Sequence, residues 1–178
     1  MGSEPRVLVV GATGILRPAV LQLARSGRTV VAVARGRVDL TTLEAAGGQR
    51  VEVVPIDLTR SREVAAATAT GGALAGPLDA ALVYQPRTFA PEFDRVLAHV
   101  HGRVVRLLTS AAGAPDVAPW DDGDRRPDEA RLLLGWTGPD DAPRWHTPEE
   151  VSAAALEVAA HGRDAVLGRV RPWAGRPH

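Results

Sequence analysis

The first 110 residues alternate between short apolar runs and segments with helical spacing. Each apolar run is rich in valine, leucine or alanine and lacks polar alternation, as expected of strands that are buried on both faces. Short strands separated by helices indicate right-handed βαβ units, and therefore a parallel sheet covered by helices on both sides. The predicted strands are residues 6–10, 29–34, 51–56, 79–84 and 103–109, and the predicted helices are residues 15–25, 41–46, 61–69 and 93–100.

The pattern changes after residue 110. Residues 111–130 contain three prolines and several aspartates, which predicts a loop over the edge of the sheet. Residues 131–137 are strand-like, and residues 144–145 are predicted to return beside them as a hairpin. A helix then begins at Thr147, the predicted N-cap, with Glu150 three residues later to complete a capping box.

These elements predict an α/β fold: a Rossmann-like, doubly wound parallel sheet of strand order 3-2-1-4-5. An edge strand or hairpin and a final helix are added at the C-terminal end. We expect residues 1–164 to form a single Rossmann-like domain and residues 165–178 to form a C-terminal tail.

A glycine-rich turn follows the first strand directly. Its sequence is Gly11-Ala12-Thr13-Gly14-Ile15, and a helix begins just after it. Gly11 can adopt the dihedral angles of a tight turn, and Gly14 allows a pyrophosphate to approach the backbone. The free N–H groups and the dipole of the helix N-terminus favour an anion there. The turn therefore predicts nucleotide binding; the alternative is a tight turn that binds nothing.

Gly11-Ala12-Thr13-Gly14 resembles the G-[AG]-T-G-x-x-G motif of atypical and extended short-chain dehydrogenases/reductases. The resemblance of the chain to this family covers roughly its first 110 residues. Asp57 and Leu58 follow the third strand, where the resemblance implies contacts with adenine. The resemblance also implies cofactor contacts for Thr13 and Ile15 in the turn. The third glycine of the motif is replaced by Arg17, so the packing of helix on strand must differ here. The segment from Arg144 to Glu150 is similar to one in compact bacterial members, but this match is much less specific.

The residues after the second strand bear on the choice between NADP and NAD. An NAD site needs a carboxylate at the end of this strand to bind the ribose 2′-hydroxyl. Here the strand is followed by Arg35 and Arg37, and Asp39 arrives late. Arginines suit a 2′-phosphate because they form charge-assisted hydrogen bonds and stack on adenine. We therefore predict NADP rather than NAD, against the alternative of a solvent-exposed basic turn.

The resemblance also implies a catalytic Tyr-x-x-x-Lys pair, with serine and asparagine, but this chain contains neither lysine nor asparagine. Three other side chains are candidates for catalysis. Ser110 follows the fifth strand, where the serine of the family would fall, and it could bind a carbonyl or imine. Tyr84, the single tyrosine, ends the fourth strand and could donate a proton. His146 precedes the last helix and could lie over the same edge of the sheet.

The composition excludes several kinds of chemistry and partner. The 21 basic and 21 acidic side chains balance, which argues against nucleic acid as the main partner. The absence of cysteine removes disulfides, thiol nucleophiles and zinc–thiolate sites, and the absence of lysine removes Schiff-base chemistry. We predict no metal site, because the acidic cluster at residues 121–124 is typical of a solvated loop. No membrane span or signal peptide is evident, so we expect a soluble, cytoplasmic protein.

We predict an NADP(H)-dependent reductase that acts on a small carbonyl, imine or activated alkene. The chain leaves little room for a substrate domain, so residues 111–130, or a second subunit in a homodimer, would have to complete the pocket. Two alternatives stay open. In the first, the protein is a non-catalytic NADP-binding redox sensor or scaffold. In the second, it is a non-redox enzyme, such as a cyclase or isomerase, that reuses the fold.

Overall fold

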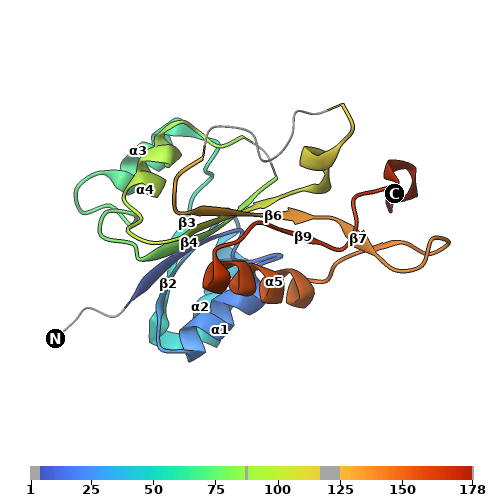
Figure 1. Cartoon of the computed structure of the whole chain (residues 1–178). Helices are drawn as coiled ribbons and strands as arrows, with labels where there is room; N and C mark the ends of the chain where they lie inside the picture. The colour runs from blue at the N-terminus through green and yellow to red at the C-terminus, as the bar shows by residue number, and fades with distance from the viewer. Residues whose placement is uncertain (1–4, 87, 117–124, 178) are drawn as a thin grey trace.

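A single seven-stranded parallel sheet runs through the molecule in the order β3-β2-β1-β4-β5-β6-β9 (Figure 1). The structure is a computed structural model that describes residues 5–86, 88–116 and 125–177. The predicted order 3-2-1-4-5 is confirmed, with β6 and β9 added beside β5. The strands are β1 (Arg6–Val10), β2 (Thr29–Ala34), β3 (Val51–Pro55), β4 (Ala80–Gln85), β5 (Val104–Leu108), β6 (Glu129–Leu134) and β9 (Ala165–Leu167).

Helices cover both faces of this sheet, as Figure 1 shows. Alternate residues of β1 point to opposite sides: Val7 and Val9 pack with α1, α2 and α5, whereas Leu8 and Val10 pack with α3 and α4. Burial on both faces explains why the strands are apolar throughout. Within the described residues, no helix is both long and apolar enough to cross a membrane. The helices are α1 (Arg17–Arg25), α2 (Arg37–Gly47), α3 (Ser61–Thr68), α4 (Glu92–Ala98) and α5 (Pro148–His161), with short 3₁₀ turns at Gly48–Arg50, Ser110–Gly113 and Trp173–Gly175.

The C-terminal region corrects the expectation of a tail that begins at residue 165. Residues Ala165–Leu167 form β9, which pairs in parallel with β6 and extends the sheet. The helix α5 ends at Gly162, which has the left-handed conformation (φ 69°, ψ 26°) that turns the chain back toward the sheet. The side chains of Ala165 and Leu167 then pack on the same core as α5. Three residues are too few to show a strand pattern, so the sequence does not indicate β9.

The strand expected at residues 131–137 is divided in two. Its first part belongs to β6, whereas β7 (Trp136–Thr137) pairs with β8 (Arg144–Trp145) as a separate antiparallel hairpin. The division falls at Gly135, whose N–H donates a 2.9 Å hydrogen bond to the carbonyl of Leu167. A Cβ at this position would collide with the backbone of Arg169, so only glycine allows the chain to pass there. The predicted pairing of residues 144–145 in a hairpin is correct.

Helix α2 begins four residues earlier than the sequence indicated. Its N-cap is Gly36, whose backbone is extended, so Arg37 lies in the first turn of the helix. Leu40 and Leu43 are fully buried at a spacing of three residues, which fixes the face that α2 turns toward the core. Arg37 is therefore a solvent-exposed helical residue rather than part of the turn after β2.

Helix α5 has the predicted capping box. The Glu150 N–H donates to the Thr147 hydroxyl at 3.3 Å, and the Thr147 N–H donates to the Glu150 carboxylate at 2.8 Å. Arg144 donates two hydrogen bonds of 2.8 Å to the same carboxylate and, with the Thr147 N–H, lowers the pKa of Glu150 to about 2. The Ser152 hydroxyl donates to the carbonyl of Ile15 at 3.1 Å, so α5 supports the glycine-rich turn directly.

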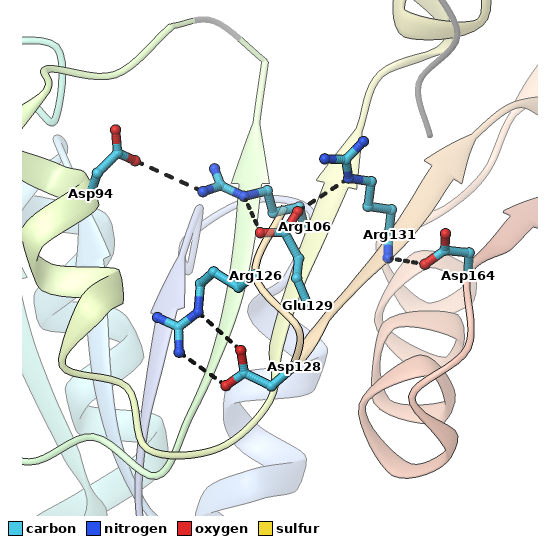
Figure 2. Close-up of polar contacts among 7 residues, drawn as sticks. All are labelled: Asp94, Arg106, Arg126, Asp128, Glu129, Arg131 and Asp164. Atoms are coloured by element: carbon cyan, nitrogen blue, oxygen red, sulfur yellow. Dashed lines mark hydrogen bonds and ion pairs between the residues drawn. The ribbon is translucent and has the colours of Figure 1, made fainter. Parts of the chain in front are cut away.

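A charged network lies on the α3/α4 side of β5 and β6 (Figure 2). The Glu129 side chain, only 2% exposed, accepts a 2.9 Å hydrogen bond from Arg106 Nε and a 3.1 Å one from Arg131 Nε. Arg106 and Arg131 are cross-strand neighbours, so their positive charges would repel each other without the carboxylate between them. The backbone N–H of Arg131 also donates to Asp164 at 2.9 Å, which ties β6 to the start of β9.

Candidate functional site: a cleft at the carboxyl edge of the sheet

A cleft of about 810 Å³ opens at the carboxyl ends of β1, β2, β3 and β4. This edge is where open α/β sheets bind ligands, and a cleft of this volume suits a cofactor-sized molecule. Every residue predicted to bind the cofactor lines the cleft except Arg37, and the candidate acid Tyr84 lines it as well. The predicted residues in its walls are Gly11, Thr13, Gly14, Ile15, Arg35, Asp57, Leu58 and Tyr84.

The glycine-rich turn forms the centre of the cleft. Gly11 has a positive φ of 85°, and its N–H donates to the carbonyl of Val33 at 3.1 Å, which anchors the turn to β2. A Cβ at Gly14 would meet nothing nearer than the carbonyl of Gly11 at 4.0 Å, so its exposed surface is open to a ligand. Helix α1 begins beyond this turn with no side-chain cap and no acidic residue in its first turn, whereas Arg17, its first residue, is not among the described residues that line the cleft. This environment favours a phosphate.

Charges of both signs lie after β2. Arg35 and Asp39 both line the cleft and are both exposed. The Asp39 carboxylate lies close to Gly36: a Cβ built on that glycine would be 2.9 Å from Asp39 Oδ2. Arg37 is not among the described residues that line the cleft, so of the two arginines it is Arg35 that faces a ligand. The walls of the cleft thus include both a guanidinium, a group that can bind a phosphate, and a carboxylate, a group that can accept a hydrogen bond from a hydroxyl.

The turn after β3 is held by an ionised carboxylate. Asp57 Oδ1 accepts hydrogen bonds from the N–H of Thr59 at 3.0 Å and from its hydroxyl at 2.8 Å. These two bonds, together with the charges of Arg35 and Arg60, lower the pKa of Asp57. Glu63 accepts from the Asp57 N–H at 2.7 Å and pairs with Arg60 at 3.1 Å. The turn therefore presents a fixed, negatively charged acceptor toward the cleft.

Tyr84 closes the cleft on the β4 side. Its ring lies against the glycine turn: a Cβ built on Gly11 would be 3.1 Å from Tyr84 Cβ and 3.3 Å from Tyr84 Cδ1. The side chain is half-buried, and this burial raises the pKa of the phenol. At neutral pH the hydroxyl is therefore protonated, and it is a weaker acid than tyrosine in water. Phe89 lines the same wall, where the N–H of Ala90 donates to the carbonyl of Leu58 at 2.8 Å.

The other two catalytic candidates do not join these residues. Ser110 is half-buried at the start of the 3₁₀ turn after β5, and it is not among the described residues that line the cleft. His146 is 8% exposed, and its Nδ1 lies 3.3 Å from Glu150 Oε2. Its Nε2 is packed against Gly168, where any Cβ would collide with it. The imidazole thus belongs to the α5 cap and the end of β9.

Several cleft residues were not found from the sequence. Thr59, Arg60 and Glu63 line the cleft beside Asp57, and Phe89 lies beyond β4. Glu63 has a recognisable signal in the sequence, because acidic residues are favoured in the first turn of a helix. In the structure its carboxylate accepts a hydrogen bond from the Asp57 N–H. Phe89 has none, since its position depends on how the segment after β4 packs against Leu58.

No metal centre is found in the part of the chain that the structure describes, where no three histidine, cysteine or acidic side chains gather in a ligating arrangement. The acidic cluster at residues 121–124 lies outside the described residues.

Comparison with known proteins identifies relatives by structure only. No protein-family profile and no curated protein matches the sequence. The chain is similar to an oxidoreductase of the short-chain dehydrogenase/reductase family from Burkholderia thailandensis (17% identity, TM-score 0.65, 98% of this chain and 95% of that one). It is also similar to 3-ketoacyl-(acyl-carrier-protein) reductase from Brucella melitensis complexed with NADH (15% identity, TM-score 0.61, 92% of this chain and 96% of that one). A third similar structure is YwfH, an NADPH dependent reductase involved in bacilysin biosynthesis (14% identity, TM-score 0.64, 93% of this chain and 98% of that one).

The fold and the cleft together define the class of this protein. It is a Rossmann-fold α/β protein with its glycine turn between β1 and α1. Its fold is similar to that of solved short-chain dehydrogenases/reductases, in agreement with the resemblance in the sequence.

Proposed function

We propose that the chain binds NADP(H) in this cleft and reduces a small carbonyl, imine or activated alkene. One observation supports this most strongly. The glycine-rich turn that leads into α1, the guanidinium of Arg35 and the ionised Asp57 with Leu58 all face one cleft. They suit, respectively, the diphosphate, the 2′-phosphate and the adenine of this cofactor. The reductases among its structural neighbours agree with the proposal.

Arg35 and Asp39 are expected to act in opposite directions on cofactor choice. Arg35→Ala should weaken NADPH binding about tenfold or more and change NADH binding little, because only NADPH has the 2′-phosphate. Asp39→Ala should strengthen NADPH binding by removing a carboxylate from beside that phosphate. Titration calorimetry of both nucleotides measures each effect. Arg37→Ala serves as the matched control, with little change expected because Arg37 lies outside the cleft wall. Equal losses of NADH and NADPH in Arg35→Ala would contradict the choice of NADP.

The chemistry requires a hydride and a proton. NADPH, when bound, would supply the hydride. Ser110, at the end of β5, would hold the carbonyl oxygen or imine nitrogen by a hydrogen bond. The proton would reach that atom from Tyr84 or from water, since the chain has no lysine and His146 is committed to the α5 cap. Because burial raises the pKa of Tyr84, imines and activated alkenes are favoured over simple ketones as substrates.

Turnover is tested by the fall in absorbance of NADPH with a panel of small carbonyls, imines and activated alkenes. In Ser110→Ala we expect kcat/KM to fall about 100-fold with the best substrate, because an oriented hydrogen bond to the reacting group is lost. NADPH affinity should be unchanged. The matched control is Ser26→Ala, at the far end of α1 and away from the cleft, which should leave kcat/KM unchanged. Unchanged turnover in Ser110→Ala would remove Ser110 from the mechanism.

A second candidate is a non-catalytic NADP-binding sensor. It is favoured by the separation of Ser110 and His146 from the cleft and by the half-buried phenol of Tyr84, whose pKa is raised. Tight NADPH binding with no turnover of any compound in the panel would support this candidate and exclude the reductase.

A further inference from the structure

We infer that Tyr84 ends the binding site, so that nucleotide recognition is confined to the adenosine half of the dinucleotide and its phosphates. This inference rests on the proposed NADP(H) binding and specifies which part of the ligand the protein holds. It makes Tyr84 a specificity-determining residue: its ring is the wall that separates the cleft from the end of β5.

The composition of the cleft walls gives the first argument. The described residues that line it come from the turns after β1, β2 and β3 and from the end of β4 with the segment behind it. Thr109 and Ser110, at the end of β5, are not among them, and neither is any described residue of β6 or α5. Among the described residues in the walls, the charged side chains all lie on the β2 and β3 side of the glycine turn, namely Arg35, Asp39, Asp57, Arg60 and Glu63.

The position of Tyr84 gives the second argument. Val10 and Val83 are partners across β1 and β4, so Gly11 and Tyr84 follow them side by side at the carboxyl edge. The Tyr84 ring is in van der Waals reach of Gly11, at the point where a dinucleotide would pass from β1 toward β4 and β5. The ring is half-buried, so it presents an aromatic wall next to the phosphate position.

The consequence for binding is direct. Groups beyond the diphosphate lie past Tyr84, where no described residue of β5, β6 or α5 lines the cleft, and affinity depends on contacts and desolvated polar groups. Oxidised and reduced cofactor, and a nucleotide that lacks nicotinamide altogether, should then bind alike. A protein of this kind would exchange its cofactor without discriminating between the two redox states.

Titration calorimetry of the whole protein with four probes tests this inference: NADPH, NADP⁺, the 2′-phosphate of ADP-ribose and nicotinamide mononucleotide. We expect the first three to bind within about threefold of one another and the mononucleotide to show no binding. NADPH binding about tenfold or more tighter than the 2′-phosphate of ADP-ribose would overturn the inference while supporting the nucleotide site. If none of the four binds, the proposed function fails and the inference fails with it.

Two variants locate the effect at the Tyr84 ring. Tyr84→Ala removes the wall, so NADPH should become at least about fivefold tighter than the 2′-phosphate of ADP-ribose. Tyr84→Phe keeps the ring, and the ratio of the two affinities should stay near that of the original protein. Thermal unfolding of both variants shows that they are folded. An unchanged ratio in a folded Tyr84→Ala protein would overturn the assignment of the wall to Tyr84.

Discussion

Replacing Gly14 by aspartate is expected to lower NADPH affinity by at least about 100-fold, because a carboxylate would enter the position proposed for the diphosphate. Gly14 faces the cleft, and its side-chain direction is open, with the Gly11 carbonyl 4.0 Å from a built Cβ as the nearest atom. The new side chain therefore fits without a clash, and its effect is electrostatic. Titration calorimetry with NADPH measures the loss, and thermal unfolding should show a folded protein of nearly unchanged stability.

The matched control is Gly14→Ala. This variant adds a Cβ in the same open position but no charge, so NADPH should bind within a few-fold of the original affinity, about 1 kcal/mol at most. If Gly14→Asp and Gly14→Ala weaken binding equally, the effect is steric and the diphosphate position is wrong. If Gly14→Asp binds NADPH normally, the cleft is not the nucleotide site.

Glu129→Gln is expected to lower the free energy of unfolding by about 3 kcal/mol, because a buried charge that pairs two arginines is removed. Glu129 is 2% exposed and accepts from both Arg106 and Arg131, which are cross-strand neighbours (Figure 2). A glutamine keeps the size of the side chain. However, its amide group would direct N–H donors at one guanidinium, and the two arginines would lose the negative charge they share. Chemical denaturation followed by circular dichroism measures the change.

Asp128→Asn is the matched control for this prediction. Asp128 is adjacent in sequence and pairs with Arg126 through hydrogen bonds of 3.1 and 2.9 Å, but its side chain is 38% exposed. Solvent screens an ion pair of this kind, so we expect a loss of no more than about 1 kcal/mol. Equal losses of unfolding free energy in Glu129→Gln and Asp128→Asn would show that the burial of Glu129 does not determine how much this side chain contributes to stability.

The glycine turn and the ends of the first three strands were predictable because their residues are local to the elements that position them. Gly11, Gly14, Arg35 and Asp57 each follow a buried strand directly, and parallel strands bring such positions to one edge of a sheet. Arg37 was misplaced because α2 begins at Arg37 itself, with Gly36 as its N-cap, and a glycine N-cap leaves no side-chain signal. His146 precedes its helix as predicted, but packing against Gly168 turns its ring away from the cleft.

The sequence by itself determined the doubly wound sheet, the glycine turn and the capping box of α5, because apolar periodicity, glycine turns and caps all act over a few residues. Only the tertiary structure showed that residues 165–167 complete the sheet, that Glu129 joins two arginines, and that Tyr84 lies against Gly11. Each of these depends on which segments, distant in the chain, pack side by side. A sequence pattern records the burial of a residue, but the identity of its neighbours is set when the whole sheet assembles.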